Sequence, residues 1–307
     1  MKKYLQNKIA ESKLALPVTM VYAVVVWLAG GLLNGEWLIQ FVCFTLAAFL
    51  MMELNTIHAL IRIYSRMVSC VFIMLMCLLC FLFSSIPGAI TQVCVVAATM
   101  LLFNGYQDKT SSGWSYYSFL MTGIASLAYV HILFYLPIVW LVMIFQLQSF
   151  SWRTCTASLL GLVTPYWIWC CWLGWNEDFT PIVNHFVPLG DFSLPFDLSL
   201  LNSHYLITLG FVVLMFIIST IHYIRKHHDD KIRIRLLYGT FMWMCLVTTT
   251  FILLQPQHYD VLIRILIINT APLLGHFLAL THTRVTNIAF FIIIAATFLI
   301  TGYNLWM

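Results

Sequence analysis

The stretch NSHYLITLGFVVLMFIISTIH, residues 202–222, contains no Asp, Glu, Lys or Arg and is long enough to cross a lipid bilayer as one helix. A hydrocarbon core of about 30 Å needs about 20 helical residues. Ten further apolar stretches lie along the chain, separated by polar breaks. Only helices and closed barrels satisfy the backbone in lipid, and these runs are continuous rather than alternating, so the pattern predicts helices.

The predicted fold class is therefore all-α, a polytopic transmembrane helix bundle with about 11 spans, or about 9 to 11 given the usual boundary error. The composition agrees, because 62% hydrophobic and 8% charged residues would leave large apolar patches on a soluble domain. Two segments, 90–103 and 115–129, are weak as spans and are predicted to form a close-packed hairpin or a partly re-entrant element. The predicted spans are 17–33, 37–60, 67–86, 88–103, 115–129, 131–147, 154–174, 202–222, 236–254, 261–281 and 285–305.

The basic residues of the short breaks predict an orientation. Every short break that carries Lys or Arg is an alternate one, which by the positive-inside rule places the N-terminus and these breaks on the cytoplasmic side. Arg264, near the outer face, is expected to form an i,i+4 ion pair with Asp260. The basic breaks contain Arg62 and Arg66, Lys109, Arg153, residues 225–235, and Arg284.

The chain divides into two parts. Residues 1–15, with Lys2, Lys3, Lys8 and Lys13, are predicted to form an amphipathic segment on the inner membrane surface. A cleaved signal peptide is the competing interpretation, but ten more apolar runs follow the first one. Residues 16–307 are predicted to form one transmembrane helical domain with an outer loop at 175–201.

No pattern in the sequence indicates a cofactor or a metal site. The nine cysteines lie in or at the ends of apolar runs, so they are interpreted as buried small hydrophobes, and the pair Cys77 and Cys80 lacks a second ligand pair. One metal-like group lies in a loop whose Lys and Arg residues oppose cation binding. Its members are His222, His227, His228, Asp229 and Asp230.

Several small-residue and aromatic motifs carry a resemblance. The chain contains Asn104-Gly105, the run Gly123-Ile-Ala-Ser-Leu-Ala-Tyr129, Pro137, Trp152-Arg153, and the run Gly161-Leu-Val-Thr-Pro165-Tyr166. In these motifs it resembles an uncharacterised family of bacterial polytopic inner-membrane proteins, which implies an architecture and little chemistry. The later spans also look like those of polytopic sugar transferases that use polyprenyl-linked donors. Those enzymes carry an acidic pair in a large first outer loop, whereas the break here is only Asn34-Gly35-Glu36, and Glu36 is interpreted as an interfacial cap.

A polar stripe is predicted where the second span meets the inner interface. At about 100° per residue, Asn55, His58, Arg62 and Arg66 share one face of a helix, while Glu53 points away. Arginine forks match phosphate oxygens, so the stripe is a candidate lipid-phosphate site, although helix-end arginines also serve as topogenic signals. Glu53 lies inside the predicted span, where ionisable groups are rare and often functional.

Two other groups are candidates for chemistry. In the outer loop, Glu177 and Asp178 lie near aromatic residues and are catalytic candidates, with His185 as a candidate general base. A solvated acidic loop is the alternative interpretation. In the tenth span, Asn269 and His276 are seven residues apart on one face, and either a hydrogen bond between helices or a proton relay is expected. Asn176, Asp191 and Asp197 complete the polar set of the outer loop.

The sequence therefore predicts an integral membrane protein and leaves three functions open. The first is envelope biogenesis with handling of a lipid or a lipid-linked glycan; an enzyme of this kind would be glycosyltransferase-like, although no complete catalytic motif is present. The second is proton-coupled solute transport that uses Glu53, His58 and His276. The third is a noncatalytic subunit of a membrane complex. The expected partners are membrane lipids, with a lipid-linked glycan or a membrane protein complex as the alternatives. No nucleic acid is expected, since the excess of basic residues follows from membrane topology.

Overall fold

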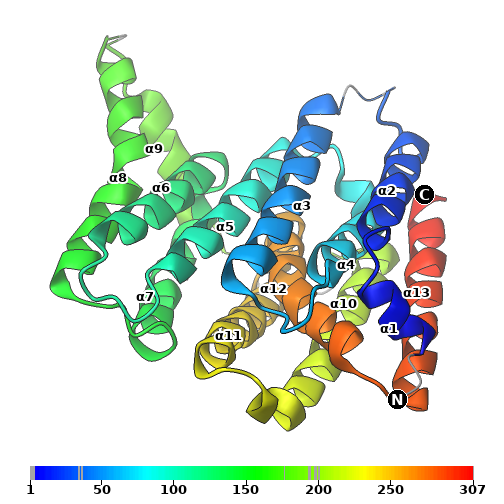
Figure 1. Ribbon diagram of the computed structural model, residues 1–307. Coiled ribbons are helices and arrows are strands. Elements are labelled where there is room, and N and C mark those ends of the chain that lie inside the picture. Colours follow the sequence, from blue (N-terminus) through cyan, green and yellow to red (C-terminus); the bar gives the residue numbers. More distant parts are fainter. Residues whose placement is uncertain are drawn as a thin grey trace.

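The computed structural model describes residues 4–33, 35, 37–175, 177–192, 195–196, 199 and 201–306, and these residues contain helices and no strand (Figure 1). Asn34, Glu36, Asn176 and Asp197 lie outside the described residues, as do Lys2 and Lys3. The helices are α1 Leu5–Ala10, α2 Ala15–Ala29, α3 Leu38–His58, α4 Met67–Met76 with η1 Cys77–Leu82, α5 Ile86–Asn104, α6 Ser112–Ala128, η2 Val130–Tyr135 with α7 Leu136–Phe145, α8 Trp152–Trp175, α9 Thr180–Phe186, η3 Val187–Gly190, α10 Ser203–Lys226, η5 His227–Asp229, α11 Ile232–Leu254, η6 Pro256–His258, α12 Tyr259–Leu280 and α13 Arg284–Leu305.

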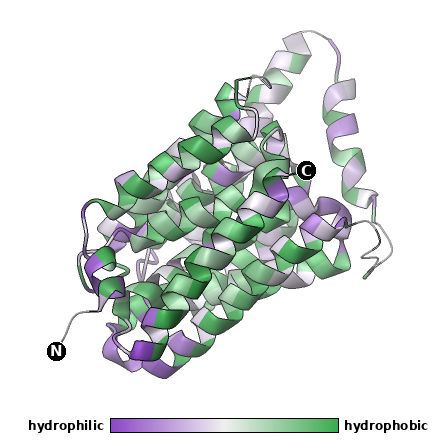
Figure 2. Cartoon of the chain, turned by 90° about the vertical axis from the view of Figure 1, so that its right-hand side faces the viewer, coloured by the Kyte–Doolittle hydropathy of each residue, from purple (hydrophilic) through white to green (hydrophobic). Residues whose placement is uncertain are grey.

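Among the described residues, 7 helical segments are long and apolar enough to cross a membrane: those of α3, α5, α8, α10, α11, α12 and α13. Shorter apolar segments are α2, α4 with η1, and η2 with α7, whereas α6 falls in neither group. Figure 2 shows hydrophobic residues along most of the helices and hydrophilic ones mainly near their ends. The all-helical, multi-pass class is thus confirmed, while the count of about 11 spans and the cytoplasmic N-terminus stay predictions.

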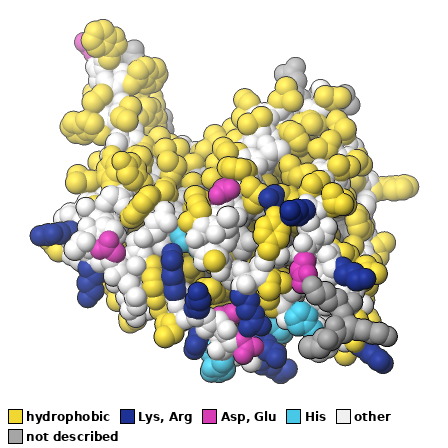
Figure 3. Space-filling view, viewed as in Figure 1, with side chains coloured by type: hydrophobic (Ala, Val, Ile, Leu, Met, Phe, Trp, Pro, Cys, Tyr) yellow, Lys and Arg dark blue, Asp and Glu magenta, His cyan; other side chains and the backbone are white. Residues whose placement is uncertain are grey.

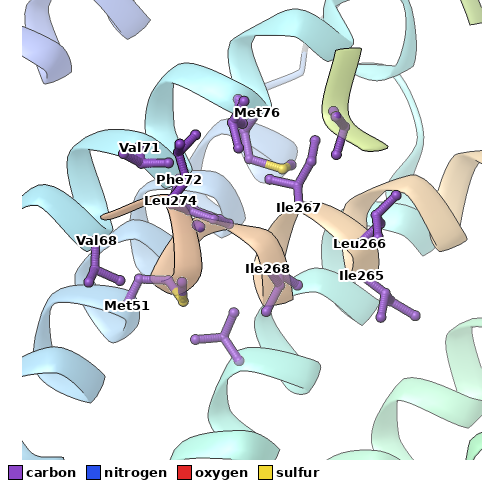
Figure 4. Packing of buried hydrophobic residues seen from close by; sticks show 14 of the residues in the cluster. Met51, Val68, Val71, Phe72, Met76, Ile265, Leu266, Ile267, Ile268 and Leu274 are labelled. Carbon is purple, nitrogen blue, oxygen red and sulfur yellow. The ribbon is translucent and has the colours of Figure 1, made fainter. Parts of the chain in front are cut away.

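Helix α12 is the buried centre of the bundle. Every residue from Val261 to Ala279 is buried, and α4, α5, α10 and α11 all pack against it. Figure 4 shows Ile267 and Leu274 of α12 among Met51 of α3 and Val68 and Phe72 of α4. Gly275 allows the close approach of α4, since a Cβ there would lie 3.1 Å from the Val68 backbone. This all-round burial is the state expected of a helix that is apolar on every face.

The helices α5, α6 and α8 form a laterally extended arm (Figure 1). Ser118 of α6 donates a 2.8 Å hydrogen bond to the Ala98 carbonyl of α5, which confirms the close-packed hairpin expected for these two segments. Gly123 lets α6 approach α8, because a Cβ there would lie 2.7 Å from the Leu162 carbonyl oxygen. Small residues at such contacts are typical of helix packing in membranes.

Contacts between loops define two ends of the molecule. All described Lys and Arg residues except Arg264 lie in the N-terminal segment or in or next to the connections at one end, which we therefore call the basic end. These connections are 59–66, 105–111, 146–151, 227–231 and 281–283. Arg62 meets Asp229 across two of these connections, and Ser151 bonds the Lys109 carbonyl across two others. Figure 3 shows Lys and Arg gathered over the lower part of one face, below a hydrophobic upper part.

The N-terminal helix α1 packs on this end through its polar side. Gln6 and Asn7 are buried; Gln6 Nε2 donates to the Leu278 carbonyl at 2.6 Å, and Asn7 Nδ2 donates to the Thr281 carbonyl at 2.9 Å. These two carbonyls belong to the last turn and the C-cap of α12, which have no partners within the helix. The expected amphipathic segment is therefore a short helix whose Gln6 and Asn7 side chains face the protein, while Leu5 and Lys8 are exposed.

At the opposite end, Arg264 holds three elements together. Its side chain is only 5% exposed; Nε donates to Asp260 Oδ1 at 3.0 Å, Nη1 to Gln92 Oε1 at 3.2 Å, and Nη2 to the Leu82 carbonyl at 2.5 Å. Asp260 also accepts a hydrogen bond from Ser85, the N-cap of α5. The expected i,i+4 pair is present, but it forms the centre of a buried network rather than an exposed interfacial contact.

We predict that Arg264→Met destabilises the protein by about 3–5 kcal/mol, because it leaves the buried Leu82 carbonyl and Gln92 without their donor and also removes the ion-pair partner of Asp260. The double variant R264M/D260M should lose less than the single one, since neither charge is then left unpaired. Thermal unfolding in detergent measures both, with the exposed Arg284→Met as the control. Equal stability of R264M and R284M would contradict the structural role of Arg264.

Candidate functional site at the basic end

The predicted polar stripe is not a continuous helical face. Helix α3 ends at His58, because Ala59 adopts a left-handed conformation with φ 48°. Asn55 stabilises the turn that follows, since its Nδ2 donates to the Ser65 carbonyl at 2.8 Å and its Oδ1 accepts from the Ile61 backbone at 3.3 Å. Helical spacing therefore does not align Arg62 and Arg66 with Asn55, and the expectation of one helical stripe was wrong beyond His58.

His58 is buried and joins three elements. Its Nε2 lies 3.2 Å from the Met100 carbonyl of α5, and its Nδ1 lies 3.1 Å from Nη2 of Arg233 in the first turn of α11. An imidazole that donates from Nε2 and accepts at Nδ1 satisfies both contacts in its neutral form. Arg233 also lies over the Tyr106 ring, 5.7 Å from its centroid. The contact with His58 thus holds the Arg233 side chain at the basic end. The spacing of residues in the sequence does not reveal this contact.

The arginines of this end have few acidic partners. Arg62 lies 3.8 Å from Asp229, and both side chains are largely exposed, so their attraction is weak. Arg66 contacts the Tyr64 hydroxyl and the Met52 sulfur, and forms no ion pair with any described residue. Arg235 donates to the Asp230 backbone carbonyl rather than to a carboxylate. Guanidinium groups in this state retain donors for an external anion.

Glu53 does not complete this group. It is half-buried on α3, and its side chain forms neither a hydrogen bond nor an ion pair with the residues that the structure describes. Its position five residues before His58 does not bring the two side chains into contact. The structure therefore does not assemble Glu53, His58 and His276 into one hydrogen-bonded chain.

A buried acid–imidazole pair lies beneath the basic end. His276 Nε2 of α12 is 3.0 Å from Asp230 Oδ2, and the two side chains are 2% and 3% exposed. His276 Nδ1, the Tyr223 hydroxyl and His222 Nδ1 are buried near it without a hydrogen-bond partner in the described structure. The rings of Tyr223 and His276 lie 5.1 Å apart. A carboxylate that orients an imidazole while the second ring nitrogen stays free is an arrangement suited to holding and moving a proton.

The remaining histidines of this region do not form a metal centre with one another. Within the described residues, no group of three His, Cys, Asp or Glu side chains could hold a metal ion. The sequence group 222–230 is divided: Asp230 turns inward to His276, Asp229 turns outward to Arg62, and His227 bonds the Ile224 carbonyl at 2.7 Å.

Asn269 lies deeper in the bundle than His276. Its Nδ2 donates to the Ile265 carbonyl of its own helix at 2.8 Å, so the expected hydrogen bond to another helix is absent for this residue among the described contacts. It lines a cavity of about 60 Å³ together with Thr99, Ser118 and Tyr135. That volume accommodates a few water molecules.

The outer-loop candidates lie at the opposite end and do not converge. Glu177 is exposed with φ 54°, and Asp178 accepts a 2.9 Å hydrogen bond from the Thr180 backbone at the start of α9. Hydrogen bonds from the Thr180 side chain and backbone lower the pKa of the Asp178 carboxyl. His185 lies 3.1 Å from the Ser126 carbonyl and 3.4 Å from the Tyr166 hydroxyl, and burial lowers its pKa. These contacts anchor α9 on the arm.

No family model, curated protein or solved structure matches the chain. The membrane class therefore rests on the helices themselves, and the role of each side chain rests on its contacts.

We predict that Asp230 and its neighbour Asp229 differ sharply in their effect on stability. Asp230→Ala leaves His276 Nε2 buried without its partner and should cost about 1–3 kcal/mol. Asp229→Ala removes an exposed ion pair and should change stability by less than about 1 kcal/mol. Thermal unfolding and hydrogen exchange of residues 227–231 in detergent measure both variants. Equal effects of the two would show that the pair with His276 contributes nothing.

Proposed function

We propose that this multi-pass membrane protein binds the phosphate-bearing headgroup of a lipid or a lipid-linked glycan at its basic end. The observation that carries the proposal is the placement of Arg62 and Arg66 on the connection 59–66 next to Arg233 and Arg235 in the first turn of α11. Among the described residues, one exposed carboxylate, Asp229, is the only acidic ion-pair partner of these arginines. A basic cluster at the end of a helix bundle attracts anionic headgroups, and planar guanidinium groups match phosphate oxygens.

The cellular setting of the proposal follows from the charge pattern and the sequence resemblance. A basic end on the cytoplasmic side, as the positive-inside rule expects, would meet the inner leaflet of a bacterial cytoplasmic membrane. The resemblance to bacterial inner-membrane proteins and to polyprenyl-donor sugar transferases supports a role in envelope biogenesis. An enzymatic version needs an acid on the other side of the membrane, for which Glu177 and Asp178 are the candidates.

We predict that R62Q/R66Q loses retained anionic phospholipid or polyprenyl phosphate when the protein is purified in mild detergent. A basic residue near an anionic membrane contributes about 1 kcal/mol, so two lost charges should weaken retention roughly 30-fold. Native mass spectrometry counts the bound lipid. The control K109Q/R153Q removes the same charge from other connections of the same end. Equal loss in the two double variants would indicate general charge attraction and overturn a specific site.

Proton-coupled transport is the second candidate, and the buried pair of Asp230 and His276 is the observation that favours it. Intramembrane ionisable residues that pair with one another often mark proton pathways. We predict that His276→Asn abolishes acid-driven proton uptake into proteoliposomes loaded with a pH-sensitive dye, whereas His282→Asn, at an exposed position of the same end, leaves uptake intact. Unchanged uptake in H276N would remove this candidate.

A further inference from the structure

An apolar cavity of about 370 Å³ lies between α2, α4, α12 and α13. Its walls include Leu14, Val18, Met74, Leu278, Ile294 and Phe298. The hydroxyl groups among the lining residues are turned to partners: Thr19 donates to the Leu16 carbonyl, Tyr22 to Thr301, and Thr297 to the Ile293 carbonyl. A ligand in the cavity would therefore contact almost only hydrocarbon groups. Such a lining favours binding of a saturated or isoprenoid chain over binding of a polar solute.

The depth of the cavity matches one leaflet of a bilayer. On α2 and α4 its lining begins next to the basic end, with Leu14 and Met67, and reaches Tyr22 and Leu75; on α13 it runs from Phe290 to Phe298, a stretch that starts six residues inside that helix. Each of these three walls runs in the same direction over eight residues, about 12 Å of helix at 1.5 Å per residue. Half of a hydrocarbon core of about 30 Å is about 15 Å. The lining on α2 and α4 is thus about as long as one leaflet is deep.

Positive charge exceeds negative charge where α1 meets the cavity. Ile9 and Ser12 line the cavity, and the exposed Lys8 and Lys13 are their neighbours in the chain, with one exposed acid, Glu11, between the two lysines. Neither lysine forms an ion pair with a described residue. Gln6 and Asn7 hold α1 in place through hydrogen bonds to Leu278 and Thr281, so the lysines sit on an anchored segment. An anionic headgroup at this depth would meet these ammonium groups.

We infer that this cavity binds one acyl chain of an anionic phospholipid drawn from the leaflet at the basic end. The inference names the ligand class for the proposed headgroup binding, and it rests on that proposal only for the charge of the headgroup. A chain that enters where α1 meets the cavity replaces contact with mobile lipid by contact with fixed walls, and its methylenes fill the cavity over about the depth of one leaflet. A polyprenyl chain long enough to cross both leaflets exceeds this depth.

A matched pair of substitutions on α2 tests the inference. Val18 lines the cavity and is 65% exposed, whereas Val21 is 64% exposed and lies outside the lining. Both variants, Val18→Trp and Val21→Trp, add the same bulk to the same helix. The protein is placed in nanodiscs that contain phosphatidylglycerol with a photoactivatable group near the end of one acyl chain, and adducts are mapped by mass spectrometry.

Adducts in the wild-type protein should concentrate on the cavity walls, at residues such as Met74 and Phe298. V18W should reduce them about tenfold, the effect of excluding about two methylenes from an apolar site, while V21W leaves them unchanged. Ile294→Trp, on the opposite wall, repeats the test should V18W fail to fold. Adducts spread evenly over the lipid-facing residues, or equal patterns in V18W and V21W, would overturn the inference. Crosslinks to a helix of a second copy would also overturn it.

The same experiment separates this inference from the proposed function. R62Q/R66Q in these nanodiscs should keep the cavity adducts if the chain site exists, even where retention of anionic lipid in detergent is lost. If V18W loses the cavity adducts and R62Q/R66Q retains lipid as the wild type does, the acyl-chain site is supported and the arginine headgroup site is contradicted. If V18W keeps the adducts and R62Q/R66Q loses lipid retention, the headgroup site is supported and the acyl-chain site is contradicted.

Discussion

The burial of α12 on every side is the constraint on which the rest of the structure depends. A helix enclosed by other helices in a membrane has neither water nor lipid headgroups to satisfy its polar side chains, so each of them needs a partner from the protein. Arg264 near one end obtains its partners from the Leu82 carbonyl, Gln92 and Asp260, and His276 near the other obtains Asp230. These contacts tie the connections at both ends of the bundle to its central helix.

The charged residues have different partners at the two ends of the bundle, and this difference is the reason for assigning the candidate binding site to the basic end. At the Arg264 end the positive charge meets a carboxylate that also binds Ser85, so the network is closed and its role is structural. At the basic end, Arg62 pairs with one exposed carboxylate, Asp229, while Arg66, Arg233 and Arg235 form no ion pair with a described residue. Asn55 holds the connection that carries Arg62 and Arg66, and His58 contacts Arg233. A closed network stabilises a fold, whereas positive groups left open at a membrane surface are available to an anionic ligand.

The sequence predicted an all-helical, multi-pass fold, because each crossing of a bilayer needs a long apolar run. The run 285–305 became α13 with a shift of one residue at its start, while the run 67–86 contains a break at Leu79 that no change in hydropathy marks. The site was predicted only in part. Arg62 and Arg66 were recognised from their spacing, but that spacing assumed a helix that Ala59 ends. Asp230, Arg233 and Arg264 acquired their roles from partners far away in the chain, and such contacts leave no local pattern.

The position of the apolar cavity argues for a ligand that is handled from one leaflet. The cavity and the basic end lie at the same end of the bundle. A single amphiphilic molecule can therefore contact the apolar walls of the cavity with its chain and the basic side chains with its headgroup. A polar solute would instead need a polar path along the bundle. Helix α12 fills the centre, and the cavity beside Asn269 measures about 60 Å³, large enough for a few waters and too small for a sugar. The same burial that stabilises the fold therefore favours binding of a lipid over passage of a solute through this arrangement of helices.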